Sequence, residues 1–212
     1  MKNIKQVISV ISLATLPLSS FATPVPVDDF IAISAYLGER FSDDLKDTET
    51  GQKADIDNNF AQALALSWYY GSNTEGELFY SNSKHDFSMS GSNPSDKNVS
   101  TDIYISYLHF GGRVNFVNET PFSTSIGLGI GATFFVPDDN QYDNDVALSG
   151  SITGGVRYEL NDQWALKADL RVYGTVLKND SSLFCGDNEC LVKLDGEVYV
   201  QTDLMAGVEY KF

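Results

Sequence analysis

Nine ionisable residues are the candidates for chemistry, because each falls on the polar side of a segment whose hydrophobic residues alternate. A period of two places successive side chains on opposite faces of a strand, so these residues share one face. Opposite charges gathered on one face can form ion pairs, or they can line a path for a charged or polar solute. The pattern leaves both open. The nine are Glu77, Arg113, Arg157, Glu159, Lys167, Asp169, Arg171, Asp203 and Glu209.

The alternation is strictest in the last segment, which runs to Phe212. One face is long and mostly apolar, and it ends on the aromatic pair Tyr210 and Phe212, whereas the other face holds charges. A strand with lipid outside and a polar interior has this pattern. The apolar face contains Val198, Val200, Thr202, Leu204, Ala206, Val208, Tyr210 and Phe212.

Seven further segments alternate in the same way, which makes eight strands in total. The third of them is the weakest, with only Leu78 and Tyr80 on its apolar face. An even strand number is usual for single-chain bacterial barrels. In a soluble protein a second layer would have to cover the apolar faces, and no remaining segment could form it. The sequence therefore predicts an all-β fold, an eight-stranded antiparallel transmembrane up-and-down β-barrel. The other segments begin near Ile31, Phe60, Tyr104, Phe122, Val146 and Trp164.

The connections between these segments alternate in length. Three are short and turn-like, and the other four are longer and polar. Short periplasmic turns and long extracellular loops are typical of an outer-membrane barrel, and aromatic residues near both strand ends fit the two membrane interfaces. The short connections are 71–76, 118–121 and 161–163, and the long ones are 42–57, 85–100, 137–145 and 178–195.

The N-terminus predicts export. Lys2 and Lys5 precede an apolar stretch too short for a membrane helix, and Ser20-Phe21-Ala22 has the pattern of a cleavage site. We expect a signal peptide over 1–22 and one barrel domain over 23–212. Without Lys2 and Lys5, 12 basic and 29 acidic residues remain, a net charge of −17. Such a charge argues against nucleic-acid binding.

Cys185 and Cys190 are the two cysteines of the chain. In an exported protein a lone close pair is expected to form a disulfide. The loop that it would close is small, so its entropic contribution would be about 2 kcal/mol. A metal site is the alternative, but no further cysteine or histidine lies nearby.

Three stretches carry a family resemblance: 128–135, 155–164 and 206–212. They resemble the small outer-membrane barrels of the OmpA, OmpX and OmpW type. The resemblance implies the location, the outer membrane of a Gram-negative bacterium. It also implies that Tyr210 and Phe212 belong to the signal read by the outer-membrane assembly machinery. Members of this group include structural proteins, adhesion factors and narrow conduits, so the fold does not settle the function.

The interior face offers two readings. An eight-stranded barrel is just wide enough for side chains to fill it, so the charges are expected to pair into a closed core. A narrow charged solute path is the alternative. The small inward residues Gly127, Gly129 and Gly131 leave space either for a bulky neighbour such as Tyr107 or Tyr173 or for a cavity.

His109 is the histidine expected in the interior. A hydrolytic role would require a nucleophile and an orienting carboxylate, and Ser106, three residues away, faces the other side. His85 falls near a loop without an evident partner set. We therefore expect no enzyme activity, no catalytic residue, no cofactor and no bound metal. The acidic segment 138–145 lacks the spacing of an EF-hand, so it is expected to be a solvated loop, with weak divalent-cation binding as the functional alternative.

These observations predict a structural or surface role, with acidic loops presented outside the cell. A narrow channel for small hydrophobic or ionic solutes and an adhesin or surface receptor acting through the loops are the alternatives. The expected partners are outer-membrane lipid, lipopolysaccharide and the outer-membrane assembly machinery. We expect a monomer.

Overall fold

The computed structural model describes residues 30–42, 45–46, 53–70, 73–89, 99–117, 121–138, 143–177, 181–186, 189–194 and 198–212. The predicted signal peptide over 1–22 lies outside this part of the chain, so its cleavage stays a prediction. Within the described residues, no helix is long and apolar enough to cross a membrane.

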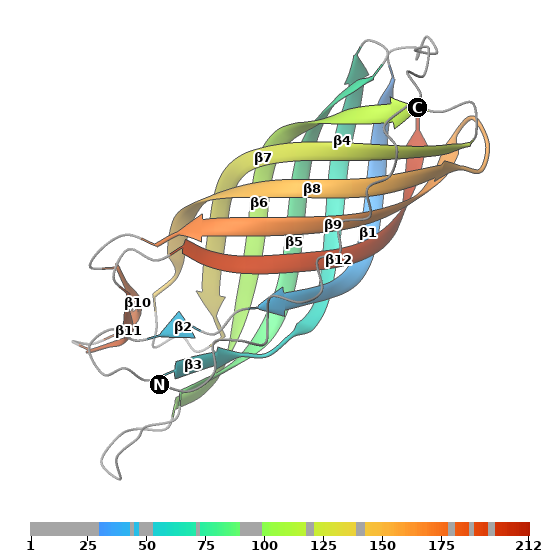
Figure 1. Cartoon of the computed structure of the whole chain (residues 1–212). Coiled ribbons are helices and arrows are strands. Elements are labelled where there is room, and N and C mark those ends of the chain that lie inside the picture. Colours follow the sequence, from blue (N-terminus) through green and yellow to red (C-terminus); the bar gives the residue numbers. More distant parts are fainter. Residues whose placement is uncertain are drawn as a thin grey trace, which may run out of the picture.

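Eight antiparallel strands form one closed barrel (Figure 1). Each strand pairs with its neighbours along the chain, and the first and last strands, β1 and β12, pair to close the wall. The predicted fold class is confirmed. The strands are β1 (Ile31–Ser42), β4 (Asn59–Tyr70), β5 (Thr74–Met89), β6 (Val99–Val117), β7 (Phe122–Pro137), β8 (Asp145–Glu159), β9 (Trp164–Val176) and β12 (Val198–Lys211).

Four short strands lie outside the barrel wall proper, all toward the same end of it (Figure 1). β2 (Leu45–Lys46) and β3 (Lys53–Ile56) extend the sheet beside β5, whereas β10 (Ser181–Gly186) and β11 (Glu189–Leu194) pair with each other. We call this the loop end of the barrel. The opposite end, where β12 finishes and the short connections lie, is the turn end.

The predicted long loop over 85–100 is wrong in part. β5 continues to Met89, β6 begins at Val99, and the two strands pair along this whole extension. The hydrophobic pattern missed it because the outward positions there are polar, among them Lys84 and Asp86. Backbone hydrogen bonds form whichever side chains the strands carry. The two strands therefore stay paired beyond the point where the alternation of apolar residues ends.

The side chains alternate between the outer wall and the lumen as the period of two requires. On β7 the outward residues Leu128 and Ile130 are 66% and 62% exposed, while the inward Thr133 is fully buried. Large hydrophobic side chains therefore cover the outside of the molecule, and its inside is the packed region.

Aromatic side chains gather at the turn end. Trp164 and Tyr210 lie with ring centroids 4.9 Å apart, and Tyr210 meets Phe212 edge to face at 5.1 Å. Phe212 is 71% exposed, and its backbone N–H donates to the carbonyl of Ile31. The two residues of the predicted assembly signal thus lie on the outer wall, beside the start of β1.

Candidate functional site

The lumen holds most of the ionisable residues singled out from the sequence. Arg157 is partly buried and Glu159 is exposed, both near the turn end, with 13% and 46% of their side chains accessible. The other seven are buried to 5% exposure or less: Glu77, Arg113, Lys167, Asp169, Arg171, Asp203 and Glu209.

Two further buried charges were missed by the sequence analysis. Arg40 is fully buried and Glu75 is 1% exposed. The alternation did contain this information, because Arg40 lies an even number of residues from the inward Tyr36 on β1. Glu75 likewise lies two residues from the inward Glu77 on β5. Extending each pattern by a few residues would have placed both side chains in the lumen.

The middle of the lumen is organised around Arg113 on β6. Its guanidinium donates to Glu77 and to Asp169, with Nη2 2.6 Å from one oxygen of each carboxylate. Arg171 on β9 donates to the second oxygen of Glu77 at 2.5 Å and lies over the ring of Phe79. Two arginines and two carboxylates from β5, β6 and β9 therefore form one network across the barrel.

A second network lies at the turn end. Glu209 accepts hydrogen bonds from Lys167 at 3.0 Å and from Arg157 at 2.8 Å. Lys167 also lies 3.6 Å from Glu75, and Arg157 continues to Glu159 at the rim. The chain of ion pairs thus runs from the exposed mouth into the buried interior.

The third network lies toward the loop end. Arg40 forms a two-pronged pair with Asp203, at 2.6 and 2.7 Å, and Tyr173 donates its hydroxyl to the same carboxylate. The rings of Tyr107 and Tyr173 stack with centroids 3.9 Å apart, and Arg40 lies over Tyr107. The two tyrosines belong to a larger cluster of buried hydrophobic residues, and its members toward the loop end are Ile103, Ile105, Phe135, Leu177 and Tyr199.

Among the residues that the structure describes, the charges inside the lumen balance, with Arg157 only partly buried. Removing a charge from water costs several kcal/mol unless a partner and hydrogen bonds compensate, so balance and pairing belong together. The strong negative charge of the chain is therefore carried outside this core. The acids are Glu75, Glu77, Asp169, Asp203 and Glu209, and the bases are Arg40, Arg113, Arg157, Lys167 and Arg171.

His109 lies across strand β7 from two serines of β8. Its Nδ1 is 2.8 Å from the hydroxyl of Ser151, and its Nε2 is 2.8 Å from that of Ser149. A neutral imidazole donates through one nitrogen and accepts through the other, so the two hydroxyls satisfy the ring. Among the described residues no carboxylate hydrogen-bonds this ring. We therefore interpret its two serine contacts as part of the packing of the barrel interior.

The inward glycines of β7 explain how His109 reaches β8. A Cβ on Gly131 would lie 2.8 Å from the His109 ring and 1.9 Å from a backbone oxygen, and a Cβ on Gly127 would lie 2.8 Å from the Arg113 side chain. The space that these glycines leave is filled by His109 and Arg113 of the neighbouring strand. Of the two readings left open by the sequence, a bulky neighbour is the one observed, but Tyr107 and Tyr173 are not that neighbour.

A polar rim marks the outer wall toward the loop end. The Asn82 amide donates to Ser106 at 2.7 Å, and beyond it Lys84 pairs with Asp102 at 2.6 Å. The Lys84 hydrogen bond lowers the pKa of Asp102, while the hydrogen bond shared with Asp102 raises the pKa of Asp86. These groups lie beyond the apolar part of the wall, where exposed charges stay solvated.

Cys185 and Cys190 lie directly opposite each other in the β10–β11 ladder. Directly opposed residues have Cα atoms about 4.5 to 5.5 Å apart, which a disulfide can span. The predicted disulfide is compatible with this register and stays a prediction. Of the acidic segment 138–145, residues 139–142 lie outside the described part of the chain.

Comparison with known proteins places the fold. No model of a protein family matches the sequence, and no curated protein matches it. Neisserial surface protein A superposes with a TM-score of 0.58 at 15% sequence identity, covering 89% of this chain and 99% of that protein. The outer membrane protein OprG from Pseudomonas aeruginosa gives 0.59 at 18% identity, covering 87% of this chain and 95% of OprG.

A third solved structure is similar to the same extent. The outer membrane protein AlkL, determined in DMPC lipid bilayers, gives a TM-score of 0.56 at 14% identity over 93% of this chain and 97% of AlkL. At these identities the likeness establishes a common fold. The resemblance to small outer-membrane barrels is confirmed at that level.

Proposed function

We propose that this protein is an integral outer-membrane barrel with a structural and surface role, whose lumen is closed by its own side chains. The observation that carries the proposal is the inverted distribution of side chains. Leu128, Ile130 and Phe110 on the wall are each more than 60% exposed, while the charges inside pair with one another. Such a surface is stable in lipid, and a paired lumen leaves little to conduct.

The proposal includes the route to the membrane. A signal peptide over 1–22 would direct export from a Gram-negative cell, and the terminal strand with Tyr210 and Phe212 would be read by the outer-membrane assembly machinery. Lipid and lipopolysaccharide would surround a monomer, and the acidic loops would face outward. The similar folds of OprG and AlkL, both outer membrane proteins by name, support this location.

Planar-bilayer conductance of the purified, refolded barrel tests the closed lumen. Heat-modifiable gel mobility serves as the folding control, because a folded barrel migrates differently from the boiled chain. Folded, inserted protein should give no discrete current steps. Reproducible steps that change on Arg171→Gln would overturn the proposal and favour a channel.

A narrow path for small solutes is the second candidate, favoured by three buried polar atoms. Tyr36 Oη, Ser67 Oγ and Arg171 Nε have no hydrogen-bond partner within the described part of the chain. Buried polar atoms of this kind are usually satisfied by water. A row of trapped waters between the networks would give protons or small solutes a passage that the ion pairs alone do not offer.

The loops give the proposed surface role its separate test. Neisserial surface protein A, a surface protein by name, shares the fold and supports such a role here. Exchanging residues 178–197 for a short Gly-Ser linker would remove the β10–β11 hairpin and leave the wall intact. Unchanged cell attachment and serum survival would argue against recognition through this hairpin.

A further inference from the structure

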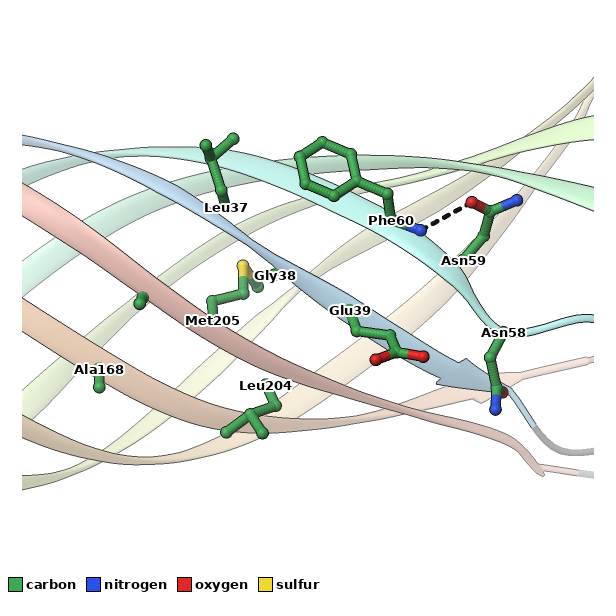
Figure 2. Close-up of a pocket in the computed structure, with 10 residues that line it drawn as sticks. Leu37, Gly38, Glu39, Asn58, Asn59, Phe60, Ala168, Leu204 and Met205 are labelled. Atoms are coloured by element: carbon green, nitrogen blue, oxygen red, sulfur yellow. Dashed lines mark hydrogen bonds between the residues drawn. The ribbon is translucent and has the colours of Figure 1, made fainter.

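A groove of about 720 Å³ lies on the outer wall where β9, β12, β1 and β4 run side by side (Figure 2). Its volume is within the range of pockets that hold one small molecule. The hollow arises from small residues, because Ala168 and Ala206 face outward beside each other and the backbone of Gly38 forms part of the floor.

The walls of the groove are apolar and exposed. Leu37, Leu204 and Phe60 are 60%, 55% and 56% exposed, and they stand around the hollow in Figure 2. The floor is sealed from within, because Met205 is 2% exposed and pairs with Gly38 at the point where a Cβ would collide with it. The groove therefore opens toward the surrounding membrane and is closed toward the lumen.

The end of the groove nearer the loop end is polar. Glu39 projects from the wall between Leu37 and Phe41, and it has no ion-pair partner within the described residues. Asn58 and Asn59 line the same end, where their carbonyl oxygens accept backbone N–H groups and their amide hydrogens stay available to donate (Figure 2). An apolar hollow thus leads to one carboxylate and two amide donors.

Outward polar residues continue from this end of the groove across β4, β5 and β6. Gln62 is exposed on the wall, where it pairs with Leu37 on one side and with Asn82 on the other. It is therefore a diagonal neighbour of Glu39, with the two Cβ atoms within about 8 Å of each other. Asn82 in turn donates to Ser106. Amides, a hydroxyl and one carboxylate form this strip, and no basic side chain is among the described residues that line the groove.

The depth of Glu39 places it where acyl chains meet a headgroup. Eight residues separate it from Ile31 at the turn end, and a strand tilted by about 40° climbs roughly 20 Å over that length. The apolar band of such barrels is about 25 Å tall, so the carboxylate lies just inside its outer edge. Outward charges at that depth are costly unless they meet a partner.

The orientation proposed above turns this end toward the outer leaflet, where lipopolysaccharide is the expected lipid. Its lipid A part carries amide N–H groups and hydroxyls where the acyl chains begin, and its phosphates lie farther out. A glycerophospholipid has only ester oxygens at that level, and these accept hydrogen bonds but cannot donate them. An ionised carboxylate only accepts, so Glu39 is matched by the donors of lipid A and by neither the esters nor the phosphates.

We propose that the groove binds one lipid A molecule through an acyl chain and through the amide and hydroxyl groups at its base. The chain would lie against Ala168 and Ala206. Glu39 would accept from the N–H and O–H groups, and Asn58 and Gln62 would donate to the neighbouring acyl carbonyls. The phosphates play no part in this contact, because the groove offers them no basic partner. This inference rests on the proposed membrane location and orientation.

The test is native mass spectrometry of the barrel released from nanodiscs that contain equal amounts of lipid A and phosphatidylglycerol, with EDTA present throughout. One lipid A should be retained and favoured about tenfold, the ratio that one hydrogen bond to a charged group supports. Monophosphoryl and diphosphoryl lipid A should be retained equally. Equal retention of lipid A and phosphatidylglycerol would overturn the inference. Retention only without EDTA would do the same, because a bridging cation would then replace the direct hydrogen bonds.

Variants separate the two parts of the contact. Glu39→Leu should abolish the preference for lipid A, whereas Asp86→Leu, which removes an exposed outward carboxylate on β5 outside the groove, should keep it. Ala168→Leu should reduce retention of both lipids, whereas Ala132→Leu, the same change on the outward face of β7, should not. An unchanged preference in Glu39→Leu would contradict the assignment.

Flotation of the protein with liposomes separates this inference from the proposed function. An inserted barrel without a preference for lipid A rejects the groove alone. Failure of the refolded protein to insert rejects the membrane location itself.

Discussion

The two sections of the lumen are filled by different mixtures of side chain. From the turn end up to the stacked pair Tyr107 and Tyr173, ion pairs dominate the interior, whereas beyond them Ile103, Ile105 and Phe135 are buried beside uncharged polar groups. Both sections are buried to nearly the same degree. The interior of one barrel is therefore packed in two ways, one dominated by ion pairs and one with fewer charges.

The difference lies in how each section depends on its members. An apolar cluster loses contact area in proportion to what is removed. A buried ion-pair network is neutral only as a set, so removing one member strands its partners away from water. The charged section should therefore be the more sensitive, and the apolar section the more tolerant of change.

Arg113→Ala should have the largest effect. It leaves Asp169 without its guanidinium partner and Glu77 with Arg171 alone, so we expect a loss of about 3 to 5 kcal/mol in the free energy of unfolding. Urea unfolding in detergent, followed by the fluorescence of Trp68 and Trp164, measures it. Lys211→Ala at the exposed rim is the control and should cost less than about 1 kcal/mol. Equal losses at the two sites would remove the distinction between core and rim pairs.

Gly131→Ala probes the junction where His109 reaches across β7. The new Cβ would meet a backbone oxygen as well as the imidazole, so we expect a loss of about 1 to 3 kcal/mol from overpacking. Gly154→Ala on β8 is the matched control, since a Cβ there meets nothing within 4 Å. The same urea titration applies, and indistinguishable midpoints would mean that the glycine at 131 is dispensable.

Ile105→Val tests the apolar section. Trimming one methylene from a fully buried side chain should cost about 0.5 to 1.5 kcal/mol, well below the effect at Arg113. Equilibrium unfolding of refolded protein again gives the value. A loss as large as that of Arg113→Ala would show that the two sections do not differ in tolerance.

The smallest effect is expected at the cysteines. β10 and β11 pair only with each other among the described strands, so replacing both Cys185 and Cys190 by serine should change barrel stability by less than about 0.5 kcal/mol. Intact mass before and after alkylation, with and without reductant, reports whether the two thiols are joined. Two alkylated cysteines in unreduced protein would refute the disulfide.

Period-two patterns carry enough information to give the strands and their faces, because lipid and lumen make opposite demands on alternate residues. Arg40 and Glu75 were within reach of the same rule. The contact between Arg113 and Asp169 was not, since Asp169 reaches Arg113 from β9 on the far side of the barrel, and which side chains meet across a lumen depends on barrel width and stagger. The sequence also could not predict that the His109 ring fills the space beside Gly131, because that contact depends on the rotamer of His109.

The seam between β1 and β12 has a consequence for how the molecule is made. Ala32 pairs with Lys211, so the joint that completes the wall unites segments almost the whole chain apart. Contacts of such long range form slowly, and here they cannot begin until translation has delivered the final strand. Until then β1 offers an unpaired edge and an apolar face to any neighbour. On the export route proposed above, a nascent chain of this design would need an escort through the aqueous compartment between the two membranes.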